Sequence, residues 1–121
     1  MQHTLEVFLD GKLVFHSDGK WLHPLFELEL FLQQQNFDPS CLMVQDKIVG
    51  RAAALLQVYL GIKQVKAGLM SELGKNVFDT HGVKYEYEQL VDRIQCRTEE
   101  MLNDEHDPEK AYEMIKVLAG K

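Results

Sequence analysis

The start of the chain has the alternation of apolar and polar residues that is typical of paired strands. Residues 4–9 place Leu5, Val7 and Leu9 on one face, as in a strand with one buried side. Asp10-Gly11 follows, a strong hairpin signal because both residues tolerate the positive φ of a tight turn. Residues 13–15 form the returning strand. The chain is therefore expected to open with a β-hairpin.

Helical and strand patterns then alternate along the chain. Pro24 suits the first turn of a helix that runs to about Gln35. A short apolar run over 41–45 is consistent with a buried strand, and Asp46 can cap a helix from about 47 to 60. That helix is apolar almost all the way round, so we expect it to be the most buried helix of the domain.

The alternation continues in the second half of the chain. A strand is predicted over 64–69, followed by a helix that Ser71 can cap and that ends near His81-Gly82. Residues 83–87 alternate again and predict a half-exposed strand. Gly61 is expected to close the preceding helix in the left-handed conformation.

Two helices are predicted to end the chain, over about 91–103 and 108–119, the second capped by Asp107. No linker or repeat interrupts the pattern, so residues 1–121 are expected to form a single domain. The order β-β-α-β-α-β-α-β-α-α favours largely parallel pairing with right-handed crossovers and helices on both faces. The predicted fold is α/β, a three-layer α/β/α sandwich whose five-stranded mixed sheet opens with a β-hairpin.

Composition narrows the classes of function. The chain has 121 residues and a formal charge of −6, and its 13 Lys and Arg are scattered, which disfavours binding to nucleic acid. The longest apolar run, Ala52–Leu56, is too short to span a membrane, and no secretory signal is visible. Cys41 and Cys96 stand apart from other ligand-type residues and are interpreted as reduced thiols. A cytoplasmic protein is expected.

Four stretches carry a resemblance to a known family: residues 5–15, DKIVGRAAALL at 46–56, residues 65–68, and VKYEYEQLV at 83–91. They resemble the domain of unknown function 1893 family, a small group of uncharacterised bacterial and archaeal proteins. The resemblance extends to about Arg97, and DKIVGRAAALL is its most specific part. It implies a cytidine-deaminase-like fold with strand order 2-1-3-4-5. The family typically has a Cys-Pro segment before its last helix, where this chain has Asp107-Pro108-Glu109.

The zinc chemistry of deaminases is not expected here. A zinc deaminase needs a His or Cys ligand spaced HxE with its catalytic Glu, and two thiolates spaced CxxC after a Pro. His23 is followed by Glu27, at the wrong spacing, and residues 46–51 contain no thiolate. No metal site and no cofactor are therefore predicted. Nucleophile-elbow, phosphate-loop, dinucleotide and zinc-protease motifs are also missing from the sequence.

A ligand, if there is one, is expected at the carboxyl ends of the strands, at the switch in strand order. Backbone N–H groups at the predicted helix start near 47–50, with the cations of Lys47 and Arg51, suit a small anionic or nucleotide-like ligand. Gly50 would let a ligand approach the backbone closely. The candidate ligand-binding residues are His23, Asp46, Lys47, Gly50, Arg51 and Ser71.

Three alternatives stay open. Asp46 and Ser71 can be ordinary helix caps, with Arg51 paired to a nearby carboxylate, in which case the segment has a structural role only. A metal-independent enzyme could use His23, Asp46 or Arg51 at the same rim. An interaction module would expose a large apolar patch on the last two helices. The sequence leaves open whether the protein forms a homo-oligomer.

Overall fold

A computed structural model describes residues 2–94, 101–102 and 104–121. The strands are β1 (Leu5–Leu9), β2 (Lys12–Ser17), β3 (Leu42–Val49), β4 (Gln64–Ser71) and β5 (Lys84–Val91). The helices are α1 (His23–Gln34), the 3₁₀ turn η1 (Pro39–Cys41), α2 (Arg51–Tyr59), α3 (Glu72–His81) and α5 (Pro108–Leu118). None of the described helices is long and apolar enough to cross a membrane.

The five strands form one mixed sheet in the order β2-β1-β3-β4-β5, which confirms the expected order. β1 runs antiparallel to both of its neighbours, and β3, β4 and β5 are parallel. The hairpin turn is also confirmed: Asp10 and Gly11 have φ values of 51° and 81°, the left-handed conformation that such turns require.

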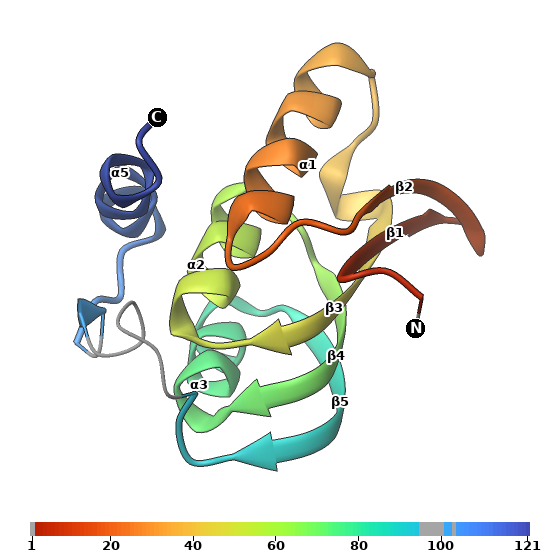
Figure 1. Cartoon of the computed structure of the whole chain (residues 1–121). Helices are drawn as coiled ribbons and strands as arrows, with labels where there is room; N and C mark the ends of the chain where they lie inside the picture. Colours follow the sequence, from red (N-terminus) through yellow and green to blue (C-terminus); the bar gives the residue numbers. More distant parts are fainter. Residues whose placement is uncertain (1, 95–100, 103) are drawn as a thin grey trace.

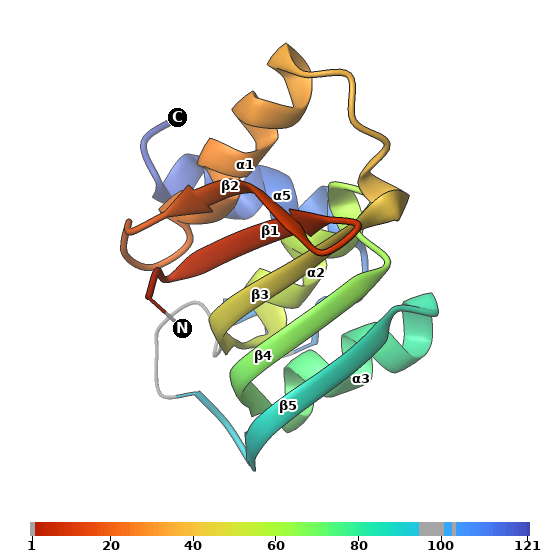
Figure 2. The ribbon, with the colours of Figure 1, turned by 90° about the vertical axis from the view of Figure 1, so that its right-hand side faces the viewer.

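The helices cover one face of this sheet. Figures 1 and 2 show α1, α2 and α3 on the same side, with α5 as a further layer outside α2. The pattern had predicted helices on both faces. The difference follows from the strand order. The connections from β2 to β3, from β3 to β4 and from β4 to β5 all advance in the same direction across the sheet. Because crossovers are right-handed, all three helices reach the same face.

The core is centred on α2. Residues 51–57 are buried without interruption, and Ala54 and Leu55 have no exposed surface. This confirms that the nearly all-apolar helix is deeply covered, by the sheet on one side and α5 on the other (Figure 1). Gly74 permits α3 to pack closely against the end of β3, because a Cβ at this position would lie 3.0 Å from the carbonyl oxygen of Val49.

The boundary between β3 and α2 differs from the prediction. Asp46 and Lys47 were expected at a helix start, but they lie in β3, and α2 begins at Arg51 with Gly50 as its N-cap. The strand continues because Asp46 is paired on both sides, with Leu5 of β1 and Ala67 of β4. Sheet hydrogen bonds have here overridden the local capping preference of Asp.

Two smaller expectations are corrected as well. Cys41 was expected in a buried strand but is exposed at the end of η1, where Asp38 caps the turn through the N–H of Ser40. Val91 was expected in a helix but ends β5, paired with Ser71. Most of that predicted helix, 91–103, and Cys96 lie outside the described residues. The last helix, capped by Asp107, is confirmed.

Candidate functional site

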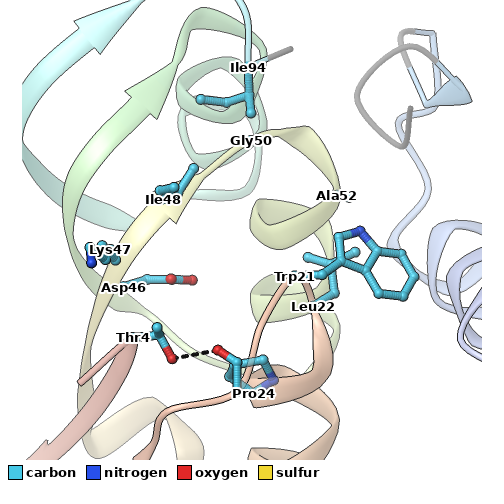
Figure 3. A pocket seen from close by; sticks show the side chains of 11 residues that line it. Thr4, Trp21, Leu22, Pro24, Asp46, Lys47, Ile48, Gly50, Ala52 and Ile94 are labelled. Atoms are coloured by element: carbon cyan, nitrogen blue, oxygen red, sulfur yellow. Dashed lines mark hydrogen bonds between the residues drawn. The ribbon is translucent and has the colours of Figure 1, made fainter. Parts of the chain in front are cut away.

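A pocket of about 240 Å³ opens at the carboxyl ends of β2 and β3 (Figure 3). Its wall is mainly apolar and comes from the loop before α1, the end of β3 and the start of α2. We call it the rim pocket. Its lining residues are Thr4, Gly19, Trp21, Leu22, Pro24, Asp46, Lys47, Ile48, Gly50, Ala52 and Ile94.

Asp46 supplies the carboxyl group of the rim pocket. Its side chain points from β3 toward the loop that carries Trp21 and Leu22 (Figure 3). One carboxyl oxygen accepts a hydrogen bond of 2.9 Å from Nε2 of Gln57, a residue of α2 with no exposed surface. The pair therefore joins the sheet to the central helix below the pocket.

Burial changes the acid–base behaviour of Asp46. The residue as a whole is half-buried, but its carboxyl group is enclosed by protein, and this loss of solvation raises its pKa from 3.8 to about 7. Hydrogen bonds from the backbone N–H groups of Ile48 and Lys47 favour the charged form and offset part of the rise. At neutral pH the group is therefore divided between its neutral and charged forms. A neutral carboxyl both donates and accepts a hydrogen bond.

The start of α2 forms one side of the rim pocket. Gly50, the N-cap, has an extended backbone and no side chain with which to cap the first turn. The N–H groups at the start of a helix have no partner within the helix, and the helix dipole favours negative charge there. Gly50 and Ala52 both line the pocket. This edge is suited to an anionic group of a ligand.

A network of hydrogen bonds fixes the loop opposite α2. The hydroxyl of Thr4 donates to the carbonyl oxygens of Ser17 and Gly19, at 2.8 and 2.9 Å. The Ser17 hydroxyl in turn donates to the carboxylate of Glu27 and accepts from the N–H of Gly19. Trp21, further along this loop, has a φ of 57°, which is uncommon for a bulky side chain. The loop is therefore held in one shape by contacts with Thr4, β2 and α1.

Three of the six candidate residues reach the rim pocket: Asp46, Lys47 and Gly50. The Lys47 side chain, however, is exposed and, by strand alternation, lies on the sheet face opposite to that of Asp46 (Figure 3). Only its backbone is therefore placed to meet a ligand beside Asp46.

The other three candidates lie outside the pocket lining. Arg51 is 3% exposed, and its Nη1 donates a hydrogen bond of 2.6 Å to the carbonyl oxygen of Glu105. Ser71 is buried and caps α3 by accepting from the N–H of Gly74. His23 is exposed at the start of α1, with its ring edge-on to Trp21. Ser71 thus caps a helix, as the sequence left open, and Arg51 contacts the backbone at Glu105, in a distant part of the sequence.

Sequence reasoning did not select several residues of the pocket wall, notably Thr4, Trp21, Leu22 and Ile48. A signal existed for Trp21, a bulky apolar residue just before the helix predicted from Pro24, where solvent-facing side chains are usually polar. Ile48 was placed in a buried helix, whereas it lies near the end of β3 and is 49% exposed.

The sheet, the one-sided helices and the rim pocket define an α/β domain with an open, mixed five-stranded sheet. The chain belongs to the family described as TM1506, domain of unknown function (DUF1893), whose model matches residues 2–118. This confirms the resemblance seen in the sequence.

A solved structure shares the fold. It is the 2.70 Å crystal structure of a DUF1893 family protein (TM1506) from Thermotoga maritima, with a TM-score of 0.82 and 23% sequence identity. The match covers 98% of this chain and 80% of that chain. No functionally curated protein matches the sequence.

Proposed function

We propose that this protein is a cytoplasmic, non-catalytic domain that binds a small anionic or nucleotide-like ligand in the rim pocket. One observation carries the proposal: the Asp46 carboxyl, with a pKa of about 7, faces an apolar pocket whose other side is the uncapped start of α2. An apolar pocket with a few convergent polar groups and a perturbed acid is the usual form of a small-molecule site.

The size of the pocket limits the ligand. Drug-sized ligands occupy clefts of roughly 300–1,000 Å³, and the rim pocket, at about 240 Å³, is smaller. It suits one ring system with a small anionic group rather than a dinucleotide. Leu22, Pro24 and Ile48 would pack against the ring, and the first turn of α2 would receive the anion.

A binding role is favoured over a catalytic one. An acid–base pair of His23 and Asp46 would support an enzyme, but His23 lies outside the pocket lining, and the side-chain partner of Asp46 is Gln57. The likeness to cytidine deaminases stays a prediction from the family resemblance, and the zinc ligands of such enzymes are missing from the sequence.

The proposal implies that binding depends on pH. An anion beside Asp46 is repelled when that carboxyl is charged, and accepted when it is neutral and can donate a hydrogen bond. The affinity is therefore expected to fall as the pH rises through about 7, the pKa of Asp46. In Asp46→Asn this decrease is expected to disappear. An affinity that falls equally in wild type and Asp46→Asn would exclude Asp46 as the cause.

Thermal-shift screening against nucleobases, nucleoside monophosphates, sugar phosphates and small carboxylates tests the proposal. A ligand at a hundred times its Kd stabilises the folded protein by about 2.7 kcal/mol. Ile48→Glu places a negative charge at the pocket mouth and is expected to abolish the shift. Leu13→Glu is the matched control, because Leu13 is an apolar strand residue of similar exposure, 42% against 49%, outside the pocket.

Two outcomes would contradict the proposal. The first is that no compound in the four classes shifts the melting temperature. The second is that Ile48→Glu and Leu13→Glu respond to the active compound as wild type does, because the ligand would then bind away from the rim pocket.

One observation favours a second candidate, an interaction module. The outer side of α5 exposes Met114, Val117 and Leu118, at 37%, 76% and 43%. Neighbouring apolar residues on a helix surface are typical of contact with a partner. Val117→Lys would leave ligand binding unchanged and would weaken association with a partner if this candidate holds.

A further inference from the structure

Two histidines and an aspartate meet where β1 begins and β2 ends. His3 precedes β1, His16 lies in β2 and Asp18 follows it, and their ligand atoms all lie within 4.8 Å of one another. We call this group the hairpin cluster. Its three members are not part of the rim pocket lining, although the adjacent residues Thr4 and Gly19 are.

The side chains of the hairpin cluster are already arranged together. Nδ1 of His3 lies 2.8 Å from Oδ1 of Asp18. The rings of His3 and His16 are stacked, with centroids 4.0 Å apart and planes 23° from parallel. Donor atoms around a tetrahedral Zn²⁺, each about 2.0–2.2 Å from the metal, lie roughly 3.3 Å apart. Binding an ion would therefore require the side chains to rotate, because the stacked rings must turn out of parallel and the ligand atoms, now up to 4.8 Å apart, must come closer together.

The backbone that carries the cluster is held by strand pairing. The N–H and the hydroxyl of Thr4 both donate to the carbonyl oxygen of Ser17, at 3.1 and 2.8 Å. The Thr4 hydroxyl also donates to the carbonyl oxygen of Gly19, at 2.9 Å. These bonds join the residue after His3 to the residues on either side of Asp18. The ligand-bearing segments thus stay together before any ion arrives.

We propose that His3, His16 and Asp18 bind a divalent transition-metal ion of the Zn²⁺ type. Imidazole nitrogen and carboxylate oxygen are ordinary Zn²⁺ ligands, and three protein ligands leave a fourth position for water or another ligand. Asp18 is 66% exposed and His3 22%, so an ion can enter from solvent. The site differs in place and ligand type from a deaminase zinc centre. The sequence predicted no metal site, because only the pairing of the hairpin brings these residues together.

Zn²⁺ titration of the full chain, free of purification tags and treated with chelator, tests the site by calorimetry. We expect one Zn²⁺ to bind per chain. We expect at least about a 10-fold loss of Zn²⁺ affinity in each of His3→Ala, His16→Ala and Asp18→Ala. Removing a residue that hydrogen-bonds to a metal ligand already costs about 10-fold, and removing the ligand itself should cost no less. His106→Ala is the matched control: it removes an exposed imidazole elsewhere and should leave the affinity unchanged.

Co²⁺ provides a second readout, because its visible absorption is strong when the ion is tetrahedral and depends on the ligands. Wild type and His106→Ala should give the same spectrum, and His16→Ala should lose it. The proposal is overturned if wild type shows no saturable Zn²⁺ binding, which would leave His3 and Asp18 as a surface ion pair. It is equally overturned if either His16→Ala or Asp18→Ala, folded as judged by circular dichroism, binds Zn²⁺ as tightly as wild type.

Discussion

Asp46→Asn is expected to make the protein more stable at neutral and alkaline pH. The folded state raises the pKa of Asp46 from 3.8 to about 7, so between these values the unfolded chain loses a proton that the folded protein keeps. Stability therefore decreases as the pH rises through this window and levels off above about 7. Asn keeps the shape of the side chain and carries no charge at any pH.

The magnitude follows from the two pKa values. The interval from 3.8 to about 7, at 1.36 kcal/mol per pH unit, corresponds to about 4 kcal/mol of stability lost above neutral pH. Because Asp46 is half-buried and its surroundings can relax around the charge, a gain of about 2–4 kcal/mol is expected for Asp46→Asn under alkaline conditions. At about pH 4 the two proteins should differ little, since the side chain of residue 46 is neutral in both folded proteins.

Urea unfolding of wild type and Asp46→Asn across this pH range measures the effect. The difference between the two free energies of unfolding isolates Asp46, because every other titrating group is common to both proteins. Glu88→Gln is the control: this carboxylate lies on β5 and is exposed, so the variant should not show the pH-dependent gain expected for Asp46→Asn. A difference between Asp46→Asn and wild type that does not change with pH would refute the reasoning.

Two further predictions concern the packing around α2. Leu55→Ala is expected to cost about 2–5 kcal/mol of unfolding free energy, since Leu55 is fully buried; a loss below about 1 kcal/mol in urea unfolding would mean that α2 lies near the surface. Arg51→Ala is expected to cost about 1–3 kcal/mol, because it removes a buried side chain that binds the carbonyl oxygen of Glu105, and to leave ligand affinity unchanged. Weaker ligand binding in Arg51→Ala, at unchanged stability, would contradict this expectation and indicate that Arg51 contacts the ligand.

Much of the fold could be predicted from the pattern because its signals are local. Asp10-Gly11 determines the hairpin, Ser71 and Asp107 cap helices, and Gly82 ends α3 in the left-handed conformation. The strand order came from the family resemblance. Periodicity indicates which segments are strands, but not which strands are neighbours in the sheet.

The end of β3 could not be predicted, because Asp46 is a good helix cap in isolation. Its place in the strand depends on β1 and β4, which pair with it from distant parts of the sequence. For the same reason the site was predicted only in part. Asp46 and Gly50 were chosen as helix-start residues, and they do line the pocket, but the acid–base property of Asp46 comes from burial beside Gln57.

Backbone amide NMR during titration with the most stabilising compound of the thermal-shift screen tests the central claim most directly. We expect saturable shifts of the amide signals of Gly50 and Ala52, at the start of α2, and of the indole N–H of Trp21. The amide signals of Leu13 in β2 and Val117 in α5 should stay in place, since neither residue lines the rim pocket. Saturable shifts confined to residues outside the pocket, or no shifts at any concentration reached, would contradict the account.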